Sequence, residues 1–200
     1  MIVDIPSVPI GVYENNNHEE HDYFINKIEY EELTEWGQRS YNKFVLDETN
    51  LKIWIESKIQ DYAKLCLATN QKLSITQSWT LKNENRASRL FKHTHPNSII
   101  SGAYYLKCNN QSSQLKIEAQ NCFTPERITW DKDPSLFQNQ PWLWQYFSYP
   151  PVIGRLYLFP SNLTHYVNAE IDNDTRCVLS FNTWFNDPIG NVDSLTFLSI

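Results

Sequence analysis

The clearest helical pattern in this 200-residue chain lies between residues 50 and 69. Apolar side chains recur there at spacings of three and four residues, while charged and amide side chains fall on the opposite side. The apolar positions are Leu51, Trp54, Ile55, Ile59, Tyr62, Ala63 and Cys66. Asp47 or Thr49 is placed to cap the first turn. The segment therefore predicts an amphipathic helix whose apolar stripe packs on the core.

After residue 70 the hydrophobic period changes to two residues, which is typical of β-strands. The change begins in the stretch 73–81, where outward and inward positions alternate. Further strands are expected at 89–94, 99–107, 114–119, 152–159, 164–170, 176–185 and 194–199. Strands of this number and length, joined by turn-rich loops, indicate an antiparallel sandwich or barrel.

The front of the chain has a different character. Residues 2–13 alternate and contain Pro6 and Pro9, which suits an edge strand and a turn. Residues 14–45 are polar and mixed, and we expect short helices there. The whole pattern predicts a mainly β protein with flanking N-terminal helices. We expect one domain, 1–200, in which a mostly helical part, 1–70, covers an outer sheet face of a β core, 71–200.

A long segment, 120–150, interrupts the strand rhythm and is rich in proline and tryptophan. A loop of that length inside a compact domain is usually functional, so it predicts a lid or a wall for a substrate, with Trp79 and Trp184 near the mouth. The alternative is a short helix around 141–147 that packs on the barrel.

Composition limits the partners. The net charge is −6, from 17 basic and 23 acidic residues, so no basic surface favours nucleic acid. There is no apolar run of 18 residues for a membrane and no pattern of a signal peptide. The four cysteines lack CxxC spacing and read as thiols in a reducing compartment. These features predict a cytoplasmic protein; an exposed first strand could also pair two copies into a homodimer.

The candidate chemistry begins with two histidines. His93 and His95 are two residues apart on an extended segment, so their imidazoles share a face and could reach one ion. His165 follows another predicted strand and precedes Arg176 by eleven residues. The pattern indicates a mononuclear metal site. His18 and the neighbouring His21, in a stretch rich in Asn and Glu, are expected to be surface groups.

Strand parity adds a possible ligand pocket. In the strand 176–185, one face carries Arg176, Val178, Ser180 and Asn182, whereas Cys177, Leu179 and Phe181 lie on the other. On the strand 99–107, Ser101, Ala103 and Tyr105 share a face. A polar face inside a barrel indicates a bound anion, with Arg176 and Tyr105 meeting around it. The alternative partner for Arg176 is Asp172 or Asp174.

Three blocks of residues together carry a family resemblance. They are His93-x-His95-Pro96-Asn97-Ser98-x-x-Ser101-Gly102-x-Tyr104-Tyr105-Leu106, then Gly154-x-Leu156-x-Leu158-Phe159-Pro160-Ser161-x-Leu163-x-His165-x-Val167, then Arg176-x5-Asn182. In order and spacing, the chain resembles the 2-oxoglutarate/iron(II) oxygenases common in marine bacteria and their phages, which are relatives of the prolyl hydroxylases. The resemblance covers about residues 77–185.

This resemblance implies a double-stranded β-helix, of jelly-roll or cupin type, that holds one Fe(II). It implies that His93 and His165 ligate the metal, that Arg176 anchors the far carboxylate of 2-oxoglutarate and that Tyr105 assists. Ser101, Ser180 and Asn182 would complete the co-substrate pocket. The expected reaction uses O₂ to hydroxylate a peptidyl or small-molecule substrate and releases succinate and CO₂.

One position departs from the superfamily pattern. His95 stands where an Asp or Glu ligand is usual, so the ligand set is His93, His95 and His165, a set that suits Zn²⁺ as well as Fe(II). The other register would use His95 and Asn97. Two other functions stay open: a three-His dioxygenase that needs no 2-oxoglutarate, and a non-enzymatic jelly-roll binding or structural module.

Overall fold

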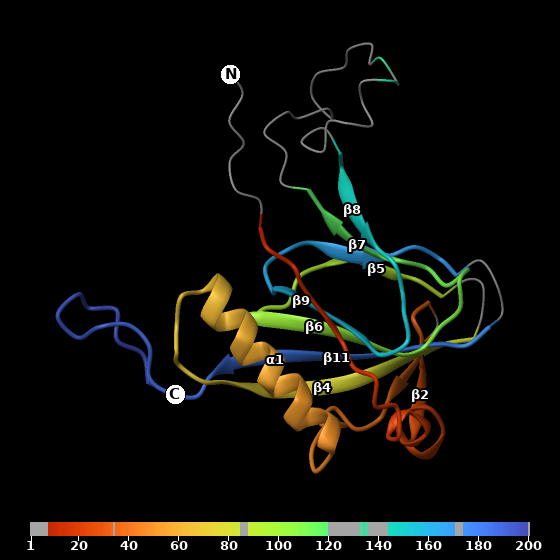
Figure 1. The fold of residues 1–200 in the computed structure, drawn as a ribbon, viewed down its shortest axis with the longest axis horizontal. Coiled ribbons are helices and arrows are strands. Elements are labelled where there is room, and N and C mark those ends of the chain that lie inside the picture. The colour runs from red at the N-terminus through yellow and green to blue at the C-terminus, as the bar shows by residue number, and fades with distance from the viewer. Residues whose placement is uncertain are drawn as a thin grey trace.

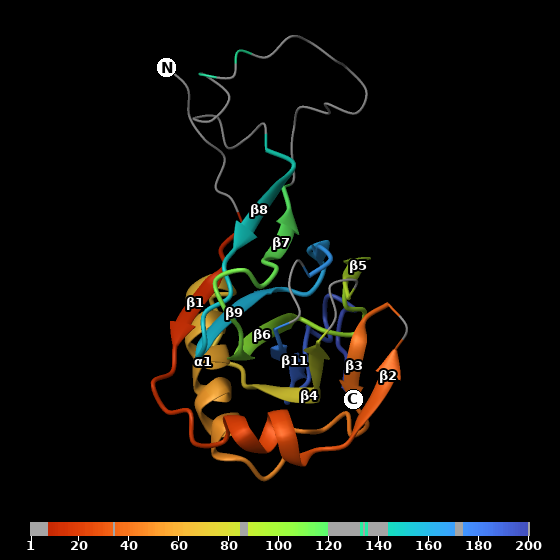
Figure 2. The same cartoon turned by 90° about the vertical axis from the view of Figure 1, so that its right-hand side faces the viewer.

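The computed structural model describes residues 8–33, 35–84, 88–119, 133, 135, 144–170 and 174–199. In this part of the chain, eleven strands form two antiparallel sheets, accompanied by one α-helix and one short π-helix (Figures 1 and 2). Among the described residues, no helix has the length and apolarity needed to cross a membrane.

The major sheet has seven strands. Their order across the sheet is β1 (Gly11–Glu14), β9 (Arg155–Pro160), β6 (Ile100–Lys107), β11 (Arg176–Phe185), β4 (Leu73–Asn83), β3 (Gly37–Ser40) and β2 (Tyr30–Leu33). The minor sheet runs β5 (Leu90–His93), β10 (His165–Val167), β7 (Leu115–Glu118) and β8 (Tyr146–Tyr149). Two facing antiparallel sheets agree with the predicted double-stranded β-helix.

Helix α1 (Asn50–Cys66) lies across the major sheet, as the sequence predicts (Figure 1). Thr49 is its cap, since the hydroxyl accepts a hydrogen bond from the backbone N–H of Lys52 at 3.3 Å. The buried stripe of the helix packs on the inward side chains of β6 and β11, and this core includes Leu51, Ile55, Ile59, Tyr62, Tyr104, Cys177, Leu179 and Phe181. The apolar face predicted for β11 is therefore confirmed.

A second core fills the space between the two sheets. Its buried members come from β6, β7, β9 and β11 and from the loop after β9: Ala103, Tyr105, Leu115, Ile117, Tyr157, Phe159, Leu163 and Val178. Val178 and Leu179, adjacent on β11, thus belong to different cores. The alternation places the opposite face of β11, which starts with Arg176, inside the barrel.

The prediction of short helices over 14–45 is largely wrong. Among the described residues of this range, the π-helix η1 (Tyr23–Lys27) is the only helical element that forms, and β2 pairs with β3, which extends the major sheet beyond β4. Gly37, with φ of 80°, follows the turn, and Glu31 faces Arg39 across the strands in an ion pair of 2.8 Å. These cross-strand contacts outweigh a polar composition that suggested helices.

Two other predictions, both for the C-terminal half of the chain, differ from the structure. Residues 194–199 form a turn and a single bridge between Ile189 and Leu198 rather than a strand. The alternative prediction for 120–150 was a short helix around 141–147. It is wrong for Tyr146 and Phe147, which belong to strand β8 and pair with β7. Most of the 120–150 segment, with its predicted role as a lid or wall, lies outside the described residues. Residues 2–7 of the predicted first strand do as well.

Candidate metal centre

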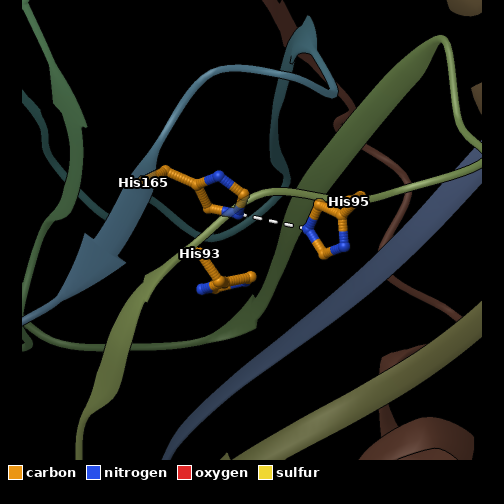
Figure 3. A group of neighbouring side chains, drawn as sticks. All are labelled: His93, His95 and His165. Carbon is orange, nitrogen blue, oxygen red and sulfur yellow. Dashed lines mark hydrogen bonds between the residues drawn. The ribbon is translucent and has the colours of Figure 1, made fainter.

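Three imidazoles converge in the lining of one cavity. His93 ends β5 and His165 begins β10, and the two residues are direct partners across these antiparallel strands. His95 lies two residues beyond β5, where its backbone N–H donates to the carbonyl of Ser161 at 2.9 Å. One nitrogen from each ring lies within 4.8 Å of the others, and Figure 3 shows the three rings turned toward a common point.

The separation of two of these nitrogens matches ligands of one ion. Nε2 of His95 and Nε2 of His165 are 3.2 Å apart. Two nitrogens that each lie about 2.1 Å from one metal ion are about 3 to 3.4 Å apart in octahedral or tetrahedral geometry. The pair is therefore spaced for shared coordination.

Backbone carbonyls fix the ring tautomers. Nδ1 of His93 lies 2.7 Å from the carbonyl oxygen of Phe91, and Nδ1 of His165 lies 2.9 Å from that of Leu163. A carbonyl oxygen only accepts, so each Nδ1 carries a proton and donates it. The lone pair of each Nε2 is then free for a metal ion, which is the usual support of a histidine ligand.

Burial keeps two of the rings neutral. Desolvation, followed by the charge of His93, lowers the pKa of His95 to about 4. Desolvation first, and then His93, lower the pKa of His165 to about 3, and this ring is packed against Phe159. Neutral imidazoles at pH 7 bind a metal ion without first losing a proton.

The histidines line a cavity of about 380 Å³ between the sheets. Arg176 and Tyr105 line the same cavity, with the guanidinium carbon 5.4 Å from the centre of the Tyr105 ring. Both side chains are buried, and among the described residues neither Tyr105 Oη nor Arg176 Nε has a hydrogen-bond partner. Burial raises the pKa of Tyr105 despite the opposing effect of Arg176, so its hydroxyl stays protonated. The cavity thus offers donors to an anion.

Other predicted pocket residues separate into two groups. Ser180 lines the cavity. Ser101 and Asn182 are outside its lining, and the Ser101 hydroxyl donates to Asn182 Oδ1 at 2.9 Å. Asn97, the ligand in the other register, is exposed in a turn with φ of 54°.

Several residues around the site escaped sequence reasoning. The buried carboxylate of Glu170 lies 3.6 Å from Arg176 Nε, whereas Asp174 accepts from Asn109 at 2.6 Å. Trp36 and Arg39 reach the cavity from the β2–β3 hairpin, and Phe91 reaches it from β5. Trp79 lines the cavity as predicted, but Trp184 is not part of the lining. Phe91 lies two residues before His93 on β5, so strand alternation could have predicted that both side chains share a face. No sequence pattern predicts that the β2–β3 hairpin reaches the cavity.

His21 also differs from its prediction. It is 7% exposed, and its Nε2 is hydrogen-bonded to Tyr104 Oη at 2.9 Å. His18 is exposed, as predicted, and its ring stacks on His21 at 4.6 Å. The polar residues around His21 in the sequence suggested a surface position, whereas its side chain is buried against Tyr104 of strand β6.

The sequence around these histidines matches the model of a protein family. A family model described as "Putative 2OG-Fe(II) oxygenase" matches residues 77–182, more than half of the chain. The chain belongs to this family. Membership in this family of oxygenases makes the protein an oxidoreductase, with Fe(II) as its metal and 2-oxoglutarate as its co-substrate. The search of curated proteins finds no match.

Solved structures share the fold at low identity. An oxidoreductase of the 2OG-Fe(II) oxygenase family from Burkholderia pseudomallei is 10% identical, with a TM-score of 0.59 over 83% of this chain and 76% of that one. HygX from Streptomyces hygroscopicus, with nickel, 2-oxoglutarate and hygromycin B bound, is 9% identical, with a TM-score of 0.58 over 88% and 83%. Apo EctD from S. alaskensis is 13% identical, with a TM-score of 0.59 over 88% and 73%. These likenesses confirm the double-stranded β-helix fold.

The site residues fit both groups that the family implies. Three converging imidazoles, two of them with Nδ1 bonded to a backbone carbonyl, suit a divalent transition metal. A buried guanidinium and an unpartnered phenol in the same cavity suit a carboxylate.

Proposed function

We propose that this chain is a non-haem Fe(II), 2-oxoglutarate-dependent oxygenase that hydroxylates its substrate and releases succinate and CO₂. The observation that carries the proposal is the convergence of three histidines in a cavity that also contains a buried arginine. A non-enzymatic jelly-roll module has no need for that combination.

In this proposal His93, His95 and His165 hold the iron. Three imidazoles on one side leave the remaining positions for 2-oxoglutarate and O₂. The bound iron and co-substrate supply the oxidative chemistry, while the protein orients them and excludes water. The carbonyls of Phe91 and Leu163 keep the rings of His93 and His165 in the binding tautomer.

Arg176 and Tyr105 receive the far carboxylate of 2-oxoglutarate. A guanidinium presents paired N–H donors to a carboxylate, and the protonated hydroxyl of Tyr105 adds a third donor. Ser180 is placed to contribute from the cavity wall. Ser101 and Asn182, which hydrogen-bond to each other outside the cavity lining, receive no contact with 2-oxoglutarate in this proposal.

We place the primary substrate against the aromatic part of the cavity lining. Trp36, Trp79 and Phe91 line this region, and Trp36 and Phe91 remain 40% and 45% exposed at its entrance. Aromatic walls suit an apolar or ring-containing part of a ligand. A small molecule is favoured by hygromycin B bound to the similarly folded HygX. A peptidyl substrate is the alternative, through the resemblance to prolyl hydroxylases.

The direct test is consumption of 2-oxoglutarate by protein loaded anaerobically with Fe(II) and then exposed to O₂. We expect slow formation of succinate even without the primary substrate, and faster formation with it. His165→Ala should lose bound iron, and the loss of affinity should exceed the about 10- to 100-fold loss typical of removing a ligand's supporting partner.

His18→Ala is the matched control, because His18 is exposed and lies outside the cavity. It should retain iron and succinate formation. Oxygen uptake that does not depend on 2-oxoglutarate would instead indicate the three-His dioxygenase. Full activity with Zn²⁺, or no metal bound by the wild-type protein, would refute the proposal.

A further inference from the structure

The ion pair between Arg176 and Glu170 is an unusual feature of the cavity floor. Both side chains are almost fully buried, at 3% and 1% exposed. Burying two charges costs free energy, so a pair of this kind requires close support from its surroundings. Glu170 was not among the residues that the sequence singled out.

Glu170 is held firmly from two sides. Its Oε2 accepts a hydrogen bond from the backbone N–H of Ser113 at 2.8 Å, and its own backbone N–H donates to the carbonyl of Ser88 at 3.1 Å. The hydroxyl of Ser113 also donates to the carbonyl of Ala169 at 3.0 Å. The carboxylate therefore has a fixed place in the fold.

The contact is made to one edge of the guanidinium. Oε1 of Glu170 lies 3.6 Å from Nε of Arg176, and this distance is too long for a direct hydrogen bond. Arg176 lines the cavity, whereas Glu170 does not. An attraction at the Nε edge leaves the two terminal nitrogens for a ligand in the cavity. The Tyr105 ring packs beside the guanidinium and limits its rotation.

We propose that Glu170 is a positioning residue that orients Arg176 for the far carboxylate of 2-oxoglutarate. This inference rests on the proposed function, because it assigns that carboxylate to Arg176. The ion pair is then a support for co-substrate binding rather than an alternative to it. Glu170 also follows β10 and precedes β11, so one segment links the metal ligand His165 to the anchor Arg176.

The test compares two ligands by anaerobic calorimetry on the Fe(II)-loaded protein. 2-Oxoglutarate has the far carboxylate, and 2-oxobutyrate has the same metal-binding end without it. We expect Glu170→Ala to weaken 2-oxoglutarate by about tenfold, by analogy with the loss of a partner that supports a metal ligand. Binding of 2-oxobutyrate should not change. Glu170→Gln keeps the length and an acceptor for the Ser113 N–H but removes the charge that faces Arg176, so it should also weaken 2-oxoglutarate, by less than Glu170→Ala.

Glu170→Asp provides a second variant if the alanine variant does not fold. It retains the charge but withdraws it from Arg176, so it should also weaken 2-oxoglutarate alone. Glu20→Ala, which removes a carboxylate that accepts from the first N–H groups of α1, is the control and should change neither affinity.

The measurements distinguish a failure of the proposed function from a failure of the positioning role of Glu170. If the wild-type protein does not prefer 2-oxoglutarate to 2-oxobutyrate, or Arg176→Ala keeps the preference, the anchor in the proposed function is wrong. If those controls behave as expected, unchanged or tighter 2-oxoglutarate binding in the Glu170→Ala and Glu170→Asp variants overturns the positioning role. Equal weakening of both ligands also overturns it, since the effect then lies at the metal.

Discussion

His21 is a buried imidazole on the far side of β6 from the metal centre. It is hydrogen-bonded to Tyr104, which belongs to the core beneath α1, while the adjacent Tyr105 faces the cavity. Burial, and then the charge of His18, lower its pKa from 6.5 to about 4. The folded state therefore holds His21 neutral at a pH at which the unfolded chain protonates it.

This depressed pKa predicts a loss of stability in acid. Below pH 6.5 the unfolded state binds more protons than the folded state, so the contribution of neutral His21 is full above pH 6.5 and is lost as the pH falls toward 4. In metal-free protein, the free energy of unfolding should fall by about 1 to 2 kcal/mol more for wild type than for His21→Gln between pH 7 and pH 4.5.

Urea unfolding at the two pH values measures this difference. His95 and His165 titrate in both proteins, so their contributions cancel. His18→Gln removes the second cause of the lowered pKa of His21, so its loss of stability in acid should be slightly smaller than that of wild type. Parallel losses in wild type and His21→Gln would mean that His21 does not remain neutral in the folded state.

Among single residues, the positions that depend on nearby residues in the sequence could be predicted. The two-residue spacing of His93 and His95 on an extended segment was enough to place both rings together, and the motif order added His165. The contact of Glu170 with Arg176 depends on the path of the chain after β10, which no spacing specifies. The burial of His21 likewise depends on a partner 83 residues away.

Strand β6 contributes buried side chains to both hydrophobic cores. Its buried residues face α1 on one side and the cavity on the other. Gly102 lies directly under the ring of Phe181, and a Cβ atom at this position would overlap that ring. The absence of a side chain at Gly102 therefore allows β6 and β11 to pack under the helix.

Replacement of Gly102 should disturb this packing. Gly102→Ala is expected to lower the free energy of unfolding by about 1 to 3 kcal/mol, the usual cost of overpacking a core. Phe181→Leu in the same chain should recover part of the loss, because it removes the ring atoms in the way. A double-mutant cycle by urea unfolding measures the coupling. Additive effects of the two substitutions would contradict the predicted contact.

At the element scale, the strongly periodic segments were predictable. Helix α1 and strands β4, β6, β9 and β11 occur close to their predicted ranges, since each buries a long apolar face. The hairpin β2–β3 was not predictable from its polar sequence, because it is stabilised by pairing with β4. Strand β8 was obscured by a nearby proline and depends on pairing with β7.

At the scale of the whole molecule, the site combines a family part and an additional part. The family match covers residues 77–182 and includes the three histidines and Arg176. Trp36 and Arg39 come from outside that range, on the hairpin that widens the major sheet. The three histidines and Arg176 thus lie within the family match, whereas part of the cavity lining lies outside it.

Strand β1 lies at one edge of the major sheet. Strand β1 pairs with β9 alone among the described strands, and Val12 is half exposed on it. A homodimer formed through this edge stays a prediction. The cytoplasmic location inferred from composition also stays a prediction.

In the proposed function, His93, His95 and His165 bind iron without a carboxylate side chain as ligand, in the cavity where Arg176 binds 2-oxoglutarate. An anaerobic crystal structure with Fe(II) and 2-oxoglutarate, using anomalous scattering at the iron edge, tests this assignment. We expect one iron peak about 2.1 Å from Nε2 of each histidine, with the far carboxylate of 2-oxoglutarate on Arg176. An iron peak elsewhere, a carboxylate side chain in place of His95, or 2-oxoglutarate away from Arg176 would contradict it.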